Sequence, residues 1–136
     1  MKFYVTGRSS NYSLVEDTFS RIKQLGHEVT FEWTALPMVK PYSDNPEKAA
    51  EFAIAGIQGV VDADVYIIFV HADGNGVYTE FGAALAAHTI NARPVIYAIG
   101  DNKSSAMFNY HPAMQWRNTV DEVFDEVLKQ LAFSGE

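Results

Sequence analysis

The 136-residue sequence contains no cysteine, which excludes a disulfide framework, a thiolate metal site and a cysteine nucleophile. Basic residues are also few, because ten Lys and Arg stand against 17 Asp and Glu and give a formal net charge of −7. This balance disfavours binding of a nucleic acid polymer, since phosphate contacts need clustered Lys and Arg. No pair of the four histidines has the spacing of metal ligands, so we expect no metal site.

Long hydrophobic runs are missing as well. The longest apolar run, Val65 to Val70, is far below the roughly 18 residues that a membrane span needs. The apolar segment after Met1 and Lys2 is too short for the core of a signal peptide. We therefore expect a cytoplasmic protein without a membrane partner. The composition, with 48% apolar and 20% charged residues, is that of an ordinary globular protein. The length of 136 residues predicts one domain over residues 1–136.

Short β-rich segments alternate with helical segments along the chain. The predicted strands are Lys2–Thr6, His27–Trp33, Asp64–Val70, Pro94–Ile99 and a short one around Trp116. The predicted helices are Ser13–Leu25, one from Pro46, one over about Val77–Ile90 and one from Thr119. This alternation predicts an α/β fold with a doubly wound parallel sheet, a three-layer α/β/α sandwich of the flavodoxin or Rossmann type. Ligands of such folds bind beyond the carboxyl ends of the strands.

Local signals mark where the helices begin and end. Ser13–Glu16 and Thr119–Glu122 fit the capping box, in which a hydroxyl and a carboxylate satisfy free backbone amides reciprocally. Gly26 supplies a left-handed stop after the first helix, and Pro46 suits the first position of the second.

The strongest functional signal is the segment Asp73–Ala86, a glycine-rich turn that leads into a helix. Glu80 lies in the first turn of the predicted helix, near the carboxyl edge of the sheet, and small residues follow it. Glu80 is therefore a candidate catalytic carboxylate. The alternative is a glutamate at the third helical position that serves only its own helix cap.

Other candidates have structural alternatives too. Asp64 precedes the apolar strand, where an acid can simply cap a turn, and Tyr4 lies on a strand, where tyrosine is usually core. The loop Gly7–Ser10 joins a strand to a helix and is either an oxyanion or hydroxyl site or a polar connection. Aromatic or soft side chains suited to stacking on a base occur in the edge loops, namely Trp33, Met38, Tyr42, Phe108 and Tyr110.

Several features occur in a fixed order over residues 2–111: Tyr4, Gly7, Asp64, the run Gly76-x-x-x-Glu80-x-Gly82-x-Ala84, and Ala92–Val95. Together they resemble the nucleoside 2-deoxyribosyltransferase superfamily, which includes the 2′-deoxynucleoside 5′-phosphate N-hydrolases. The resemblance implies that Glu80 is a nucleophile that attacks the anomeric carbon of a deoxyribosyl group and forms a covalent glycosyl-enzyme. It also implies that Tyr4 orients that carboxylate and that Asp64 binds or protonates the departing base.

The resemblance also implies a substrate pocket, with predicted substrate-binding residues Gly7, Arg8, Ser9, Asp73, Gly76, Ser105 and Met107. Asp73 lies near the position where the nucleoside transferases carry an acid for a sugar hydroxyl. By contrast, Arg8, Ser9 and Ser105 resemble the phosphate pocket of the nucleotide hydrolases, so both substrates stay open. The segment Ser105–Met107 resembles one that reaches into a neighbouring subunit's site, which implies a homodimer or a dimer-based homo-oligomer.

The sequence therefore predicts cleavage of the N-glycosidic bond of a (deoxy)nucleoside or its 5′-monophosphate, with transfer to another base or to water. Carboxylates can carry this chemistry, because its transition state resembles a sugar cation, so no cofactor is expected. One alternative is a glycohydrolase that acts on a dinucleotide such as NAD. A second is a nucleotide-sensing module without turnover, since fold alone does not separate these functions.

Overall fold

The computed structural model describes residues 1–70 and 75–134, and its centre is one five-stranded sheet with every neighbouring pair parallel. The strand order is β2-β1-β3-β4-β5. The strands are β1 (Lys2–Thr6), β2 (Glu28–Val29), β3 (Val65–Phe69), β4 (Val95–Ile99) and β5 (Met114–Arg117). The predicted α/β sandwich is confirmed, including the short last strand at Trp116.

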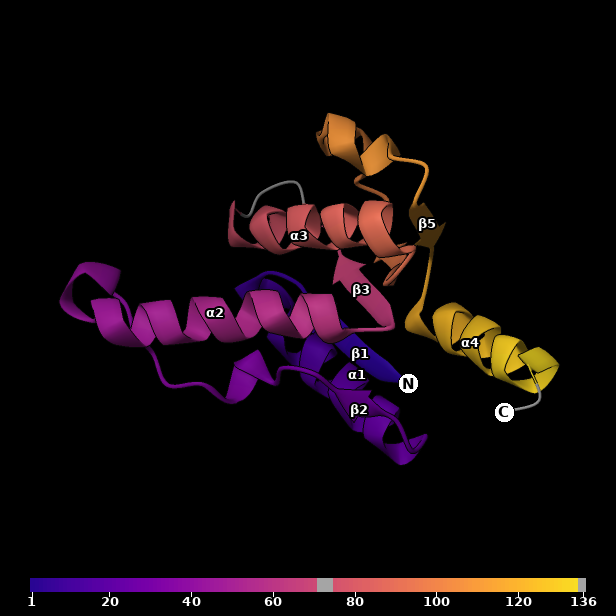
Figure 1. Cartoon of the computed structure of the whole chain (residues 1–136), viewed down its shortest axis with the longest axis horizontal. Coiled ribbons are helices and arrows are strands. Elements are labelled where there is room, and N and C mark those ends of the chain that lie inside the picture. The colour runs from indigo at the N-terminus through magenta and orange to yellow at the C-terminus, as the bar shows by residue number, and fades with distance from the viewer. Residues whose placement is uncertain (71–74, 135–136) are drawn as a thin grey trace.

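Helices cover both faces of this sheet (Figure 1). They are α1 (Tyr12–Gln24), α2 (Pro46–Asp62), α3 (Asn75–Asn91) and α4 (Val120–Ser134). One buried cluster joins the sheet to α1 and α4, and a second joins its other face to α2 and α3. No helix in the described part of the chain is long and apolar enough to cross a membrane.

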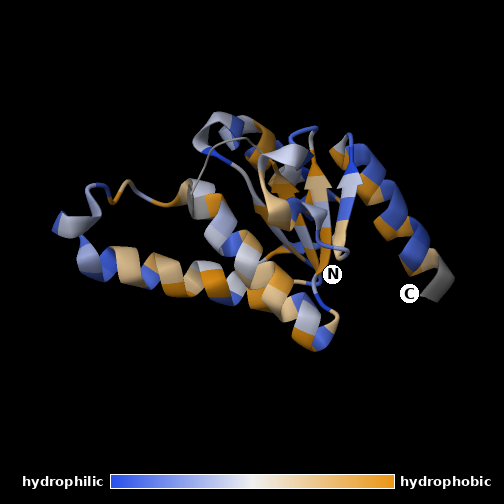
Figure 2. Cartoon of the chain, turned by 90° about the horizontal axis from the view of Figure 1, so that it is seen from above, coloured by the Kyte–Doolittle hydropathy of each residue, from blue (hydrophilic) through white to orange (hydrophobic). Residues whose placement is uncertain are grey.

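The strands alternate their side chains between these two clusters. Phe3 and Val5 belong to the cluster under α1 and α4, whereas Tyr4 between them belongs to the cluster under α2 and α3. Alternation follows from the period of two along a strand. Both faces are apolar because helices cover both, and Figure 2 shows the central strands as hydrophobic. The sequence of β1 therefore decides which of its residues can reach a site on the α2 and α3 side.

The second strand is much shorter than predicted. The prediction of a strand over residues 27–33 is wrong beyond Val29, because β2 spans only Glu28–Val29. Thr30 N still donates to Phe3 O at 2.9 Å, but the chain then leaves the sheet and forms a 3₁₀ turn at Trp33–Ala35. The Trp33 indole donates to Val5 O at 2.8 Å. Alternating polarity indicates only that one side of a segment is buried. A strand also needs backbone hydrogen bonds to a neighbouring strand, and the predicted segment 27–33 has these only at its start.

The start of α1 also differs from the prediction. The helix begins at Tyr12, and its N-cap residue, Asn11, makes no side-chain capping hydrogen bond within the described residues. The capping box expected at Ser13–Glu16 is therefore wrong, since Ser13 already lies inside the helix. The predicted stop is confirmed, because Gly26 has a φ of +83°, a conformation that favours glycine.

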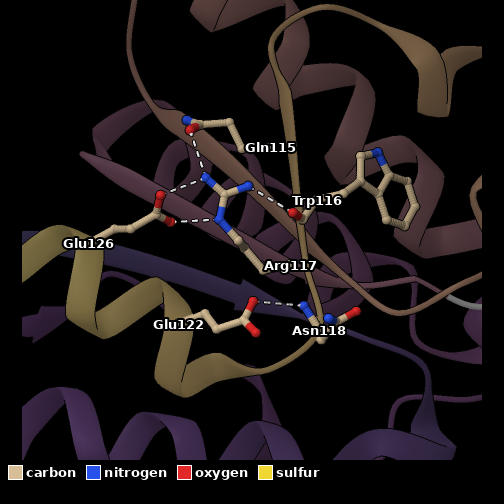
Figure 3. A network of polar contacts seen from close by, with 6 residues as sticks. All are labelled: Gln115, Trp116, Arg117, Asn118, Glu122 and Glu126. Atoms are coloured by element: carbon tan, nitrogen blue, oxygen red, sulfur yellow. Dashed lines mark hydrogen bonds and ion pairs between the residues drawn. The ribbon is translucent and has the colours of Figure 1, made fainter.

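A polar network fastens α4 to β5 (Figure 3). Arg117 Nε and Nη2 each donate to the carboxylate of Glu126 at 2.7 Å, and this guanidinium lowers the pKa of Glu126 below its ordinary value. Glu122 N donates to Thr119 Oγ1 at 3.3 Å, so one half of the predicted capping box is confirmed. Its other half differs, because Glu122 Oε2 accepts from Asn118 N at 3.1 Å.

The strand order creates a crevice between β1 and β3. The chain leaves β1 toward β2 at one side of the sheet and leaves β3 toward β4 at the other, so these neighbours form the topological switch point. Gly7 permits the close packing there, because a Cβ atom on it would lie 3.1 Å from Asn11 Cβ and 3.3 Å from Phe69 Cβ. The carboxyl ends of β1 and β3 are therefore the place to look for a site.

Candidate active site

Glu80 projects from α3 into the region beyond these strand ends. The helix begins at Asn75, and its first turn contains no acidic residue. Glu80 therefore lies beyond the first turn, and the alternative of a glutamate that serves its own helix cap is wrong. The side chain instead lines two cavities, which we call the strand-end cavity and the interhelical cavity.

The strand-end cavity has a mixed polar and apolar lining and a volume of about 310 Å³. Its lining comes from the end of β1, from two loops and from α3, namely Thr6, Gly7, Arg8, Ser9, Trp33, Lys40, Val77 and Glu80. Two of these side chains are cationic and two carry hydroxyl groups. Such a lining suits a hydroxylated or anionic group on a ligand.

The interhelical cavity is apolar and has a volume of about 260 Å³. It lies on the α2 side of the carboxylate and is lined by Phe31, Phe52, Ala53, Gly56, Ile57, Thr79 and Glu80. A Cβ atom on Gly56 would make only ordinary contacts, at 3.6 Å from Phe31 Cε2 and 3.8 Å from Tyr4 Oη, so the cavity lies close to both side chains. Its two aromatic side chains suit a planar apolar group.

The Glu80 carboxylate is poorly solvated. Its Oε2 atom is buried and has no hydrogen-bond partner among the described residues. Burial raises the pKa of Glu80 above its ordinary value, and the hydroxyls of Thr6 and Tyr4 beside it lower that pKa in part. A carboxylate that has lost water but keeps weak polar neighbours is typical of catalytic positions.

Tyr4 is brought to Glu80, as the sequence predicts. It is fully buried on β1, and its Oη has no partner within hydrogen-bonding distance among the described residues. Burial raises the pKa of Tyr4 well above its ordinary value, and the charge on Glu80 raises it further. The phenol therefore stays protonated and can donate to the carboxylate when a ligand draws the two groups together.

Asp64 is not brought to Glu80. It lies just before β3, at the amino edge of the sheet, whereas Glu80 lies beyond the carboxyl edge. Asp64 Oδ2 accepts from Lys2 N at 2.8 Å, and Oδ1 lies 3.6 Å from Arg93 Nη1. This carboxylate ties β1, β3 and the turn before β4 together, so its place is structural and leaves it no direct contact with Glu80.

The first loop is placed as predicted, since Gly7, Arg8 and Ser9 all line the strand-end cavity. Sequence reasoning missed Lys40, which reaches the cavity from the loop between Ala35 and Tyr42. It also missed Thr6 as a site residue. Thr6 ends the predicted strand directly before the glycine, so its position was a usable signal. Lys40 lies in the loop after the second predicted strand, which the strand-end rule includes, but no motif distinguished it from its neighbours.

The remaining predicted binding residues are Ser105, Met107, Gly76 and Asp73. Ser105 Oγ donates to Asn102 O at 2.7 Å and lies 3.3 Å from Tyr78 Oη on α3, and Met107 is 76% exposed. Neither residue lines either cavity within one chain. Gly76 lies in the first turn of α3. Asp73 falls outside the described residues.

Of the aromatic and soft residues expected to stack on a base, Trp33 lines the strand-end cavity. Met38 and Phe108 are 82% and 60% exposed, and neither lines either cavity within the described residues. Phe31 and Phe52 take that place beside Glu80, and sequence reasoning missed both. Phe31 comes from the segment after β2, and Phe52 comes from α2, which lies alongside α3 (Figure 1).

The chain matches no protein-family model and no curated protein sequence. The resemblance to the nucleoside 2-deoxyribosyltransferase superfamily therefore stays a prediction, and it depends on Tyr4, Gly7 and the run from Gly76 to Ala84.

Proposed function

We propose that this protein cleaves the N-glycosidic bond of a nucleoside or a nucleoside 5′-monophosphate, with Glu80 as the nucleophile. One feature carries the proposal: a poorly solvated carboxylate at the switch point of the sheet, between a cavity with cationic and hydroxyl side chains and an apolar cavity. A nucleoside also has two such parts, because a hydroxylated sugar is joined through one carbon to a planar aromatic base. A carboxylate between the two cavities would face the carbon at which these halves meet, which supports Glu80 as the nucleophile.

The reaction proceeds in two steps. A carboxylate oxygen of Glu80 forms a bond to the anomeric carbon while the bond from that carbon to the base nitrogen breaks. The base leaves with the electron pair and takes up a proton from solvent water. Water or a second base then attacks the same carbon, loses a proton and releases the carboxylate, so each turnover restores Glu80.

Neighbouring groups assist this chemistry. Tyr4 lies beside the carboxylate with its hydroxyl protonated, and a Cβ atom on Gly56, which lines the interhelical cavity, would lie 3.8 Å from Tyr4 Oη. This hydroxyl donates to the carboxylate when a bound ligand draws the two groups together. The strand-end cavity holds the sugar and its 5′ substituent beside Arg8 and Lys40, and the interhelical cavity holds the base between aromatic side chains.

A panel of substrates tests the function. Purified protein is incubated with nucleosides and 5′-monophosphates, with and without a second base, and free or exchanged base is followed by chromatography. We expect release of base from at least one member. Release of nicotinamide from NAD alone would instead support the glycohydrolase alternative. Tight binding of a nucleotide without any turnover would support a sensing module.

Two cations at the strand-end cavity favour a 5′-monophosphate as the substrate. Loss of a charged hydrogen bond to phosphate costs roughly 1.5–3 kcal/mol, or about ten- to a hundredfold. We therefore expect Arg8→Ala and Lys40→Ala each to lower kcat/KM for the monophosphate by about that factor and to leave the matching nucleoside nearly unchanged. Equal losses for both substrates would mean that these side chains support the loops and do not bind phosphate.

We also propose that the protein forms a homodimer through α3. Gly82 and Ala86 are exposed on this helix, and no heavy atom lies within 4 Å of where a Cβ on Gly82 would be. They border an apolar groove of about 430 Å³ beside Phe108. Small residues let a second backbone approach closely, and a twofold interface presents the same patch from both subunits.

Sedimentation at micromolar concentration should therefore show a dimer or a multiple of it. Ala86→Glu should convert this species to a monomer, because it buries a charge in the interface. The same change at an exposed alanine on α2, Ala50→Glu, should leave the assembly intact. A strictly monomeric protein with full activity would contradict the proposed dimer.

A further inference from the structure

A second tyrosine lies directly beside Tyr4 and has no part in the site described so far. Tyr66 is fully buried on β3, and the register of the sheet pairs it with Tyr4 on β1. The two rings stack with their centroids 5.7 Å apart and their planes within 11°. Both belong to the buried cluster under α2 and α3, the side of the sheet from which Glu80 projects.

Several buried oxygens without hydrogen-bond partners in the described part of the chain lie on the side of the sheet that α2 and α3 cover. Among the described residues, the buried side-chain oxygens without a hydrogen-bond partner include Tyr4 Oη, Tyr66 Oη and Glu80 Oε2. A buried hydroxyl without a partner costs free energy, and phenylalanine would fill nearly the same volume without that cost. The oxygen of Tyr66 therefore weakens the fold, which points to a role beyond packing.

The titratable and charged groups around Glu80 come from several elements. β1 contributes Tyr4, the two loops at the strand-end cavity contribute Arg8 and Lys40, and β3 contributes Tyr66, whose ring stacks on that of Tyr4. The residues of α2 at the interhelical cavity are all uncharged. Burial raises the pKa of Tyr66, and the charge on Glu80 raises it further, so Tyr66 keeps its proton across the working pH range.

We propose that Tyr66 is a positioning residue whose hydroxyl dipole, acting beside Tyr4, stabilises the ionised form of Glu80. In a dry apolar cluster such dipoles act strongly on a nearby charge, because little water screens them. The stack fixes the Tyr4 ring, so Tyr66 acts on the carboxylate both through space and by holding Tyr4 in place. The inference deepens the proposed function, since it concerns how the proposed nucleophile stays reactive at neutral pH.

Tyr97 supplies a matched control. It is also fully buried, and its Oη also lacks a partner among the described residues, but it belongs to the cluster under α1 and α4. Tyr66→Phe and Tyr97→Phe thus each remove one unpartnered buried oxygen, from opposite faces of the sheet. Neither change creates a cavity larger than that oxygen, so both variants should fold.

The test is a titration of the Glu80 side-chain carboxyl carbon by ¹³C NMR without substrate, with the signal assigned from its absence in Glu80→Gln. We expect Tyr66→Phe to raise the midpoint by about half a pH unit or more, because the ionised form loses a stabilising dipole. Tyr97→Phe should leave it unchanged. Equal midpoints in the two variants would overturn the inference, whatever their activities.

Two further readouts separate this inference from the proposed function. In the unmodified protein, the NMR signals of the Tyr66 ring should shift at the pH at which Glu80 titrates. Glu80→Gln should abolish that shift. This measurement does not depend on the folding of any tyrosine variant. In the pH profile of kcat/KM, the midpoint on the acidic side should lie at a higher pH in Tyr66→Phe than in the unmodified protein. If no substrate is cleaved but the Glu80 midpoint still moves, the proposed function fails while the role of Tyr66 stands.

Discussion

Glu80→Gln should lower the rate of base release by at least about a thousandfold while it stabilises the fold. The amide has nearly the same shape as the carboxylate but cannot form the bond to the anomeric carbon. It also removes a buried charge, because burial raises the pKa of Glu80 and disfavours its ionised form in the folded state. The measurements are release of base under single-turnover conditions and thermal unfolding at neutral pH.

Glu16→Gln provides the control, since Glu16 is exposed on α1 at the opposite face of the sheet. This variant should keep both the activity and the melting temperature of the unmodified protein. A folded Glu80→Gln protein with near-normal turnover would show that Glu80 is not the nucleophile. Lower stability in Glu80→Gln than in the unmodified protein would show that the carboxylate is well solvated or well paired.

The same pKa shift sets the dependence on pH. The ionised carboxylate attacks, so activity should rise with pH through a midpoint above the ordinary glutamate range of about 4.3. The stabilising effect of Glu80→Gln should be absent at low pH, where Glu80 is protonated in both folded and unfolded states. It should grow as pH rises from the unfolded pKa through the folded pKa, since only then does folding bury a charge.

Phe81→Ala should cost about 3–5 kcal/mol of stability. Phe81 is 2% exposed and belongs to the cluster that joins α2 and α3 to the sheet. Its removal loses the transfer free energy of the ring and leaves a cavity that rigid neighbours fill poorly. For a domain of this size the melting temperature should fall by roughly 10–20 °C. Urea unfolding with an unchanged m-value would measure the loss.

Ile54→Ala is the matched large-to-small substitution at an exposed position, since Ile54 on α2 is 72% exposed. It should change stability by no more than about 0.5 kcal/mol, because little of its surface is removed from water within one chain. A similar loss in both variants would mean that α3 does not pack on the sheet through Phe81. Since Phe81 adjoins Glu80, the packing of α3 also decides where the carboxylate lies.

The sequence by itself determined the order of elements and the class of fold. Its alternation of apolar strands and helices predicted the parallel sheet, because local periodicity records which face of a segment is buried. The same pattern predicted too long a strand at β2. The true length of β2 depends on how far it pairs with β1 at the edge of the sheet, and only the assembled sheet decides that. Gly26 and Pro46 marked their helix boundaries correctly, since both act through their own backbone geometry.

Part of the site was also available from the sequence. Gly7 and Arg8 were predicted because they follow the first strand, and Glu80 was predicted because a glycine-rich turn leads into its helix; all three line the strand-end cavity. The same reasoning bears on Asp64, since a residue that precedes a parallel strand lies at the opposite edge, away from the ligand crevice. The family resemblance suggested a catalytic role for Asp64 that its position in the fold does not support.

Only the tertiary structure decided which side chains surround Glu80. Tyr66 stacks on Tyr4 because β3 pairs with β1 in one register, and Lys40 reaches the same cavity because a loop crosses the strand ends. Phe52 arrives there because α2 packs beside α3. These residues are far apart in sequence, and their meeting depends on strand order and register. Local patterns determine how each segment folds, whereas the environment of a carboxylate depends on which segments pack together.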